Sequence, residues 1–580
     1  MTRTLFLVAL LFTLISSIPA SAQGVETQTI ADKIDNAMGP VTKIASDIVF
    51  WGIPVGNGLV LPVVLIVLGG TAVFLTIYFK FINLRGFGIA LRTTKSKYTN
   101  PNAAGQITHF QALSAALSAT VGLGNIAGVA VAIGLGGPGA TFWMILMGIC
   151  GMTTKFAECT LGVKYRKIDS QGRVRGGAMY YLRDGLRERG MGGIGSVLAV
   201  LFAIFVIGGA FGAGNMFQAN QAFSQFSGTF LPADAGANAP LYFGIVLAVL
   251  VGMVIIGGIV SIARVTAFLV PLMCGIYVAA ALVIIFMNLD GILPAFQLIL
   301  KSAFSAEAVG GGIIGVLIQG IKRAAFSNEA GLGSAPIAHA AVKTDRPASE
   351  GFVALLEPFI DTVVVCTMTA LVIIITGTWQ VSGAITGDGV TMVKSPDSTE
   401  AVQQIKGGQL VHTRNAEGDF VEVTSLVSSD DQSATTVEGW IPAASLEPMG
   451  GVTVTSMAFE SVITWFPTIL AIAVMLFAFS TMISWSYYGE QGVAYLFSFL
   501  GEEKVQIPIV IYKVVFCLLI IVGSSASLGN VINLSDALVF AMVLPNMVGI
   551  YLLLPVIKRE ADSYMAHVKA VDSGKSPDAE

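Results

Sequence analysis

The chain has 580 residues, of which 54% are hydrophobic and only 12% are charged. Soluble domains carry about 25% charged residues, so the composition predicts an all-α polytopic protein embedded in a lipid bilayer. The net charge of −4, without any Lys/Arg-rich cluster interleaved with aromatic residues, argues against a nucleic-acid partner.

The N-terminus has the pattern of a secretory signal peptide. Arg3 precedes the apolar run Leu5–Ile15, and small residues at 20–22 form a cleavage site. We therefore expect a signal peptide over residues 1–22 and an extracytoplasmic segment over 23–57. An uncleaved extra span is the alternative, but the apolar run is short for a membrane helix.

Apolar windows of about 20 residues predict about eleven membrane spans. Eight of them fall in a first membrane part, 58–378, and three in a second part, 457–557. The expected spans centre on 58–79, 112–134, 138–162, 194–215, 241–262, 265–287, 313–340, 352–377, 458–487, 507–526 and 533–556.

Basic residues gather in alternate loops, which sets the expected orientation. Five follow the first span and eight follow the third, whereas the loop 527–532 has none. By the positive-inside rule, the N-terminus and residues 379–456 lie outside, and the tail 558–580 is cytoplasmic. The signal peptide independently predicts the same orientation, in the inner membrane of the cell.

Residues 379–456 interrupt the membrane pattern. Short alternating runs at Leu410–Thr413, Phe420–Val423 and Gly439–Ile441 are separated by turn-forming residues, which predicts a small all-β extracytoplasmic insert. The segments GGQLVHTR, GDFVEV and EGWIPAASLEP resemble the bacterial Src-homology-3-like barrel. A disordered loop is the alternative, but the density of Val, Leu and Trp argues against it.

The segment 114–139 combines an apolar composition with a cluster of glycines. Gly122 and Gly124 surround the amide side chain of Asn125. Because a membrane helix keeps its backbone hydrogen bonds internal, this cluster predicts a break in the span. Glycine used for close helix packing is the alternative.

A break at this position would expose backbone groups of both signs. The carbonyl oxygens of Ser118 and Val121 would lose their intrahelical donors, and such oxygens suit a hard cation such as Na⁺. The amides of residues 122–125 would begin the next half-helix and attract a carboxylate by about 0.3–2 kcal/mol. One broken helix would thus offer neighbouring sites for Na⁺ and for the carboxylate of an amino acid.

A second interruption, FSNEAGLGSAP, contributes Phe326 and Asn328 as candidate substrate contacts. Two broken helices in corresponding halves are typical of secondary transporters. Glu329 at membrane depth costs about 2.5–3.5 kcal/mol unless it is paired or hydrated, so it is a candidate cation ligand, gate partner or proton carrier. Alternatively, it caps the second half-helix. Lys322 and Arg323 are expected to line an outer water path.

Polar side chains in other spans are further candidate ligands. Ser480 and Thr481 offer adjacent hydroxyl oxygens to Na⁺, although a hydroxyl in a span usually bonds back to its own helix. Thr481 shares a helix face with Trp485. Among the amides that end the fourth span, Gln218 is the candidate substrate contact, whereas Asp361 is expected to hold a neighbouring helix end.

Enzyme motifs such as GxSxG, HExxH and Walker A are absent from the sequence, so we expect neither an enzyme nor a cofactor. The five cysteines fall in or beside apolar spans without a CxxC pair, so neither disulfides nor a zinc site is expected. His109 and His339 lie near the predicted inner ends of spans, where we expect interfacial positions.

The motifs of the membrane part resemble the sodium:alanine symporter family. This resemblance rests on ATVGLGNIAGVA, KFAECTLGVKYR, GGAMYYL, GNMFQAN, KRAAFSNEAGLGSAP, EPFIDTVVVCT and FAFSTMISWSYYGEQ. It implies the leucine-transporter fold, with two inverted five-helix repeats, spans two to six and seven to eleven, and one added span. The β insert falls outside the family pattern, which leaves room for an envelope partner of residues 390–448.

The resemblance also implies uptake of alanine or glycine, driven by Na⁺ and achieved by alternating access. Proton coupling through Glu329, or an envelope sensor derived from a transporter, are the alternatives. The implied roles are carboxylate binding by Gly122, Gly124 and Asn125 with Gln218 nearby, a side-chain pocket of Phe326, Thr481 and Trp485, and a Na⁺ site of Ser118, Val121, Ser480 and Thr481.

Overall fold

The computed structural model describes most of the chain as a helical bundle that carries a β-sheet. The expected signal peptide lies outside the described residues, as does the end of the tail. The structure describes residues 30–56, 59–100, 102–232, 236, 238–305, 312–380, 383–385, 389–398, 400–407, 409–417, 419–428, 434–448 and 451–574.

Helices account for most of the first half of the chain. The α-helices are α2 (Ile30–Val49), α3 (Val63–Tyr78), α4 (Ile82–Arg85), α5 (Phe87–Thr94), α6 (His109–Thr120), α7 (Val129–Gly136), α8 (Ala140–Lys164), α9 (Ala178–Tyr180), α10 (Leu186–Glu188), α11 (Gly192–Phe211), α12 (Phe217–Phe230), α13 (Ala239–Ile255), α14 (Gly258–Met287) and α15 (Leu289–Ala303). Wider π-helical turns are η1 (Gly124–Gly128), η2 (Tyr181–Gly185) and η3 (Gly212–Met216).

The second half of the chain is also mainly helical, with the strands of the sheet between α20 and α21. Its helices are α16 (Gly312–Asn328), α17 (Ala335–His339), α18 (Pro347–Ala354), α19 (Leu356–Pro358), the π-helical η4 (Phe359–Cys366), α20 (Thr367–Ile375), α21 (Val452–Glu460), α22 (Phe466–Leu496), α23 (Gly501–Lys504), α24 (Gln506–Ser525), α25 (Leu528–Phe540) and α26 (Val543–Asp572). Short 3₁₀ turns are η5 (Thr378–Gln380), η6 (Ala443–Ser445) and η7 (Ser498–Leu500).

Among the described residues, seven helices are long and apolar enough to cross a membrane, or eight if one bent pair counts as a single span. Two shorter apolar helices, α3 and α13, accompany them. Each expected span overlaps a helix or a broken helix, but the expected total of eleven stays a prediction. The chain is a multi-pass membrane protein.

Helix α24 shows why these helices belong in lipid. Val510, Val514 and Leu518 lie one turn apart and are 58%, 55% and 56% exposed. The opposite face buries Tyr512 and Phe516 against the bundle. A helix that is apolar on its buried and exposed faces alike is stable where its surroundings are hydrocarbon rather than water.

Residues between α20 and α21 form an antiparallel sheet. The three expected β runs fall within β8, β9 and β10, and Met392, Val423 and Ile441 belong to a small core of their own. The strands within the described residues run in the order β11-β5-β8-β9-β10-β6-β7. Their bounds are β5 (Gly383–Ile385), β6 (Gly389–Val393), β7 (Ala401–Lys406), β8 (Leu410–Glu417), β9 (Phe420–Ser428), β10 (Ala434–Pro442) and β11 (Leu446–Pro448).

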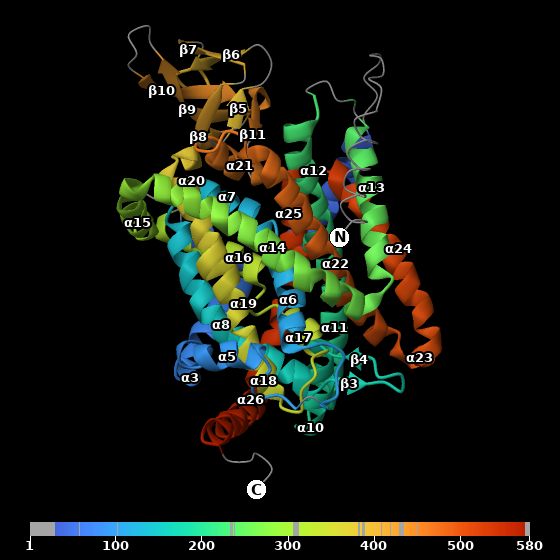
Figure 1. Ribbon diagram of the computed structural model, residues 1–580. Helices are drawn as coiled ribbons and strands as arrows, with labels where there is room; N and C mark the ends of the chain where they lie inside the picture. The colour runs from blue at the N-terminus through green and yellow to red at the C-terminus, as the bar shows by residue number, and fades with distance from the viewer. Residues whose placement is uncertain are drawn as a thin grey trace.

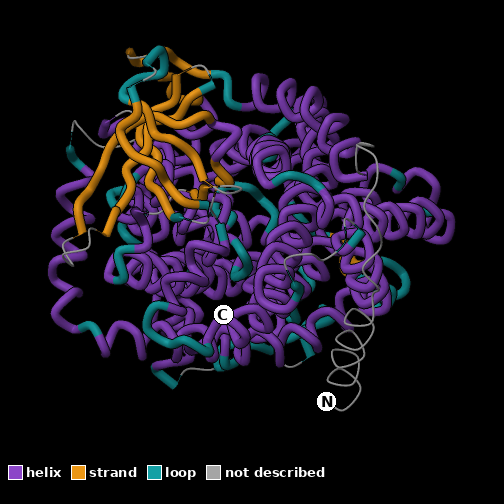
Figure 2. Tube along the Cα trace, turned by 90° about the horizontal axis from the view of Figure 1, so that it is seen from above, coloured by secondary structure: helices purple, strands orange, loops and turns teal. Residues whose placement is uncertain are grey.

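The sheet and the basic loops lie at opposite ends of the bundle. Figure 1 shows the sheet at one end and the C-terminal end of α26 at the other. Viewed from above, the sheet covers only one side of the bundle (Figure 2). The basic segment after α3 lies beside α26, because Arg92 and Lys97 form ion pairs with Asp572 at 3.1 and 2.8 Å. Short hairpins complete the structure: β1 (Gly52–Gly56) with β2 (Leu59–Pro62), and β3 (Lys167–Ile168) with β4 (Val174–Arg175).

Candidate functional site

The first expected break is present between α6 and η1. Helix α6 starts at a capping box formed by Thr108 and Gln111 and ends at Thr120. Val121 then adopts an extended conformation, and the two flanking helical segments meet at an angle of 51°. The amide of Gly122 donates to Asn125 Oδ1 at 2.8 Å. The glycine-rich sequence therefore interrupts the helix, and Asn125 satisfies one of the backbone groups that the break exposes.

The second break separates α16 from α17 and depends on unusual backbone angles. Gly331 and Gly333 have φ values of +95° and +79°, which glycine adopts without a Cβ clash. Glu329 has φ +57°, a region that a non-glycine residue occupies at a cost of about 1–3 kcal/mol. The Glu329 side chain contacts Trp485 on α22.

A small cavity lies between the two breaks. Its volume is about 10 Å³, enough for about one water molecule. It brings together four of the expected substrate contacts, Gly124, Gln218, Phe326 and Trp485, with Glu329. Residues that the sequence analysis did not single out complete the lining: Ala119, Thr120, Ala213 and Val539.

Trp485 and Glu329 form the polar contact at the wall of this cavity. The indole Nε1 of Trp485 donates to Glu329 Oε1 at 2.9 Å, and the hydroxyl of Ser334 donates to Glu329 Oε2. The ring packs directly on the backbone of Gly214, where a Cβ would lie 2.3 Å from the Trp485 Cβ. Helix α22 thus places its tryptophan against both η3 and the second break.

The expected capping role of Glu329 belongs largely to another residue. The amide of Gly333 donates to Glu158 Oε1 on α8, at 3.0 Å. Asn546 on α26 donates to the same carboxylate and to the carbonyl of Gly331. Neither Glu158 nor Asn546 carries a local sequence signal for this role, because both reach the loop from distant helices.

Gln218 lines the cavity, and its amide group is only partly used in hydrogen bonds among the described residues. Its Nε2 donates to the carbonyl of Ala213 at 3.0 Å. Its Oε1 is buried without a hydrogen-bond partner among the residues that the structure describes. A Cβ added at Gly122 would lie 3.6 Å from this oxygen. A buried carbonyl oxygen left in this way suits a donor such as an ammonium group.

The residues expected to bind Na⁺ lie at the contact between α6 and α22. Thr481 Oγ1 donates to the carbonyl of Ser118 at 3.0 Å, and Ser118 Oγ donates to the carbonyl of Ser480 at 2.7 Å. Ser480 Oγ bonds back to its own helix at Phe477. Val121 is buried where α6 ends. The structure thus joins three of the four expected ligands by hydrogen bonds.

A second oxygen-rich cluster surrounds the carboxylate of Asp361 on η4. Asn125 Nδ2 donates to Asp361 Oδ1 at 2.6 Å, whereas Ser327 Oγ and Thr362 Oγ1 donate to Oδ2 at 2.9 and 2.7 Å. Asp361 therefore ties both broken helices together, as a helix-holding residue would. This cluster, which also carries a formal negative charge, has the oxygen donors that a Na⁺ ion requires.

Asn328 and Asn125 both use their side chains inside the scaffold. Asn328 Nδ2 donates to Thr362 Oγ1 at 2.9 Å, and its Oδ1 accepts from the amide of Ala330 at 2.9 Å. Both side chains are almost fully buried. Their expected contacts with substrate stay predictions, and the observed bonds position the backbone of the two breaks.

Lys322 and Arg323 are paired with an acid, and the expected outer water path stays a prediction. Both contact Asp536 on α25, with Lys322 Nζ at 2.8 Å from Oδ2. The guanidinium of Arg323 lies 5.2 Å from the centre of the Phe326 ring. Because Phe326 lines the cavity, the guanidinium of Arg323 lies next to the cavity wall.

Comparison with known proteins establishes the family of this chain. The model of the sodium:alanine symporter family matches residues 46–405 and 421–578. The chain belongs to the sodium:alanine symporter family. The match is interrupted at 406–420, which includes β8, and it runs through much of the β insert that the sequence analysis places outside the family pattern.

Two relatives illustrate the extent of this similarity. The sodium/alanine symporter AgcS of Methanococcus maripaludis is 39% identical over 504 residues, covering 87% of this chain and 94% of that relative. The amino-acid carrier protein AlsT of Bacillus subtilis is 31% identical, covering 84% of this chain and 86% of that protein. The crystal structure of MhsT in complex with L-phenylalanine covers 77% of this chain and 89% of that chain, with 16% identity and a TM-score of 0.48.

Proposed function

We propose that this member of the sodium:alanine symporter family takes up alanine or glycine together with Na⁺ across the inner membrane. The observation that carries the proposal is the cavity between two broken helices, lined by Gly124, Gln218, Phe326 and Trp485. Broken helices with their exposed backbone groups form the binding sites of secondary transporters. The names of the relatives, which include a sodium/alanine symporter and an amino-acid carrier, support the same class of function.

The surroundings of the cavity match the three parts of a small amino acid. The amides at the start of η1 would face its carboxylate. The buried Gln218 Oε1 would accept from its ammonium group. Phe326 and Trp485 leave little room for a side chain, which favours alanine and glycine over larger substrates.

Alternating access would be consistent with the small size of the cavity. A volume of about 10 Å³ holds about one water molecule, so a bound amino acid requires the surrounding helices to move. In the leucine-transporter fold that we propose for this chain, two inverted repeats would rock against each other around the breaks. The N-terminus and the sheet would lie outside, and α26 would end in the cytoplasm.

Na⁺ would supply the driving force. One Na⁺ that crosses 100 mV contributes about 2.3 kcal/mol, and a tenfold concentration gradient adds about 1.4 kcal/mol. Together these terms permit accumulation of a zwitterion by several hundredfold. The hydroxyl and carbonyl oxygens at Ser118, Ser480 and Thr481, with the carbonyl of Val121, would bind the ion weakly enough to release it.

Uptake of labelled alanine into proteoliposomes that hold the purified protein tests this proposal. We expect accumulation when an inward Na⁺ gradient is present and little uptake when choline replaces Na⁺. Undiminished uptake in choline would exclude Na⁺ coupling. The same measurement with glycine and with larger neutral amino acids would establish the substrate range.

Proton coupling is the second candidate, because the Glu329 carboxyl lines the cavity. In that case an inward proton gradient would drive uptake in the absence of Na⁺, and Glu329→Gln would remove this response. If Glu329 only positions Trp485, the glutamine variant should keep Na⁺-driven uptake, since its amide oxygen can still accept from the indole.

The close packing at the first break leads to a mutational prediction. A Cβ on Gly122 would lie 2.5 Å from Thr481 Oγ1, so Gly122→Ala must displace the Thr481 side chain from the carbonyl of Ser118. Overpacking of this kind costs about 1–3 kcal/mol of stability, and because it displaces an expected Na⁺ ligand we expect uptake to fall about tenfold or more. Initial uptake rates over a series of Na⁺ concentrations measure the effect.

Gly128→Ala is the matched control for this variant. A Cβ at Gly128 meets nothing within 4 Å, and the residue belongs to the same broken helix. We expect near-normal uptake from the control. Equal losses of uptake in the two variants would show that this helix tolerates no added methyl group. The loss in Gly122→Ala could then not be attributed to displacement of Thr481.

A further inference from the structure

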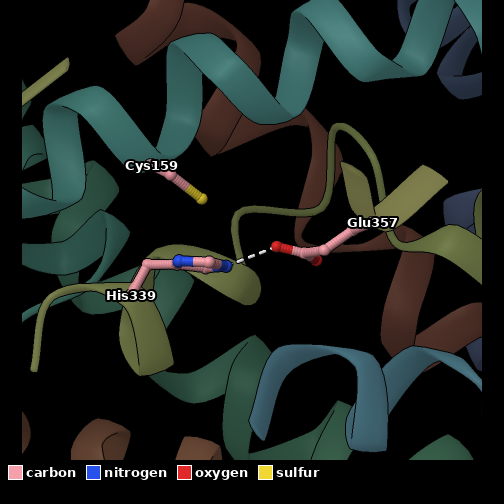
Figure 3. Close-up of side chains that lie close together, drawn as sticks. All are labelled: Cys159, His339 and Glu357. Atoms are coloured by element: carbon pink, nitrogen blue, oxygen red, sulfur yellow. Dashed lines mark hydrogen bonds and ion pairs between the residues drawn. The ribbon is translucent and has the colours of Figure 1, made fainter. Parts of the chain in front are cut away.

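A continuous file of buried polar side chains runs from a loop surface to the middle of the bundle. Thr99, which is half-buried, contacts His109 Nε2 at 2.6 Å. His109 Nδ1 contacts Glu350, which also contacts His339 Nδ1. His339 Nε2 contacts Glu357, as Figure 3 shows. Both histidines, which are expected near the inner ends of spans, are buried inside the protein, with exposed fractions of 1% and 0%.

The far end of this file is an ion pair on α8. Glu357 Oε2 lies 3.0 Å from Lys155 Nζ, and both side chains are completely buried. Lys155 is also near Glu158 and Glu329, the two carboxylates at the second break. The file therefore links the loop that contains Thr99 with the surroundings of the cavity.

The position of His339 between two carboxylates requires an additional proton. A neutral imidazole carries a hydrogen on only one of its two nitrogens. With Glu350 on Nδ1 and Glu357 on Nε2, a neutral ring and two ionised carboxylates would place a nitrogen lone pair against an oxygen lone pair. Both contacts are favourable only when one extra proton is bound, on the ring or on a carboxyl group.

A divalent metal ion is a poorer occupant of this position. Ligating atoms of Cys159, His339 and Glu357 lie within 4.8 Å of one another. However, His339 Nε2 is hydrogen-bonded to Glu357, and the second oxygen of Glu357 is paired with Lys155. A metal ion would have to break the hydrogen bond between His339 and Glu357 and the ion pair between Glu357 and Lys155. A proton instead completes the contacts that are already made.

His339 is also the last residue of α17, the second half of the broken helix. Its bonds reach α18 and α19 through the two glutamates. Arg166 holds the following turn, where its guanidinium donates to the carbonyl of Ala340 at 2.7 Å. Movement of α17 away from α18 and α19 must therefore break the contacts of His339.

We propose that His339, held between Glu350 and Glu357, is a proton-binding site that fixes α17 and exchanges its proton with solvent on the Thr99 side. Loss of the proton leaves two carboxylates competing for one N–H, which weakens the attachment of α17 and favours its movement. A higher pH on that side therefore promotes opening of this end of the bundle. The effect on uptake, though not the site itself, rests on the proposed function.

Titratable side chains on the helices that pack around His339 also lie near this site. Cys159 on α8 and Tyr488 on α22 are buried beside the carboxylates. The charge of Lys155, which pairs with Glu357, helps to set the range of pH over which the proton is lost. The titratable groups that face His339 are Glu350, Glu357, His109, Lys155, Cys159 and Tyr488.

Alkylation of Cys159 reports on this opening without any transport. The thiol is completely buried against α17, whereas Cys517 on α24 is partly exposed and serves as an internal reference. We would treat the purified full chain with a maleimide at pH 6 to 9 and quantify both cysteines by peptide mass spectrometry. The ratio of Cys159 to Cys517 labelling is expected to rise with pH, by up to about tenfold per pH unit for one proton.

His339→Gln and Glu350→Gln remove the shared proton, and in both the ratio should vary less than about twofold over the same pH range. His412→Gln, a change on strand β8, is the matched control and should keep the wild-type slope. A flat ratio in the wild type, or a slope that persists in both His339→Gln and Glu350→Gln, would overturn the proposal.

Alanine uptake at constant Na⁺ separates this inference from the proposed function. A wild-type slope in Cys159 labelling without alanine uptake would support the proton site and reject the transport proposal. Na⁺-driven uptake with pH-independent labelling would support the transport proposal and reject the proton site. Where both hold, uptake should depend on the pH of one side of the membrane, and this dependence should be lost in Glu350→Gln.

Discussion

Trp485→Ala is expected to abolish alanine uptake while the protein still reaches the membrane. The indole lines the cavity, donates to Glu329 and packs against Tyr488 with ring centres 5.3 Å apart. Its removal leaves a void and deprives a buried carboxylate of a donor. We expect a loss of about hundredfold or more in the initial rate, which corresponds to a loss of about 2.8 kcal/mol or more in binding at this wall of the cavity.

Two control variants separate the contributions of Trp485. Trp485→Phe keeps an aromatic ring but loses the N–H, so an intermediate loss of uptake would measure the bond to Glu329. Trp465→Ala removes a tryptophan that is 65% exposed, and it should leave uptake unchanged. Normal transport by Trp485→Ala, at wild-type amounts in the membrane, would show that the cavity is not the substrate site.

Asp536→Ala is expected to lower the stability of the protein strongly. Its carboxylate is fully buried and is the shared partner of Arg323 and Lys322. Without it, the almost fully buried guanidinium of Arg323 would keep its charge without a counter-ion. Breaking a buried ion pair in this way costs about 3–5 kcal/mol, which thermal unfolding in detergent would record as a clear loss of stability.

An exposed acid and a double variant test the cause of this loss. Asp562→Ala removes an exposed carboxylate that pairs with Lys558, and it should change stability little. Arg323→Met combined with Asp536→Leu replaces the two most buried charges by apolar groups, leaves the more exposed Lys322 in place, and should recover most of the loss. A double variant as unstable as Asp536→Ala would indicate that packing at Asp536, rather than its charge, matters.

Local features of the sequence were sufficient to locate the two breaks. Gly122 and Gly124 interrupt an apolar span, and Gly331 and Gly333 adopt φ values that disfavour other residues. Both signals depend on residues that are neighbours in the chain. The same locality explains why hydropathy placed the helices and why alternation placed the three β runs, whereas the number of membrane spans depends on tilts and bends that composition does not encode.

The roles of the polar side chains depended instead on partners that are distant in the chain. The Asn125 amide points to Asp361, 236 residues away, and the Glu329 carboxylate accepts from Trp485, 156 residues away. Sequence patterns identified most of these residues as unusual at membrane depth, because their burial is costly without a partner. They gave no indication of which partner each residue would find.

Apolar length and glycine clustering act over a few turns, so the residues alone are enough to predict a multi-pass membrane protein with two interrupted helices. The shared acid of Lys322 and Arg323, and the burial of His339 between Glu350 and Glu357, come instead from the packing of helices that are distant in the chain. A charged side chain is stable inside a bilayer only where it contacts a partner from another helix. The packing of the helices decides which side chains come into contact.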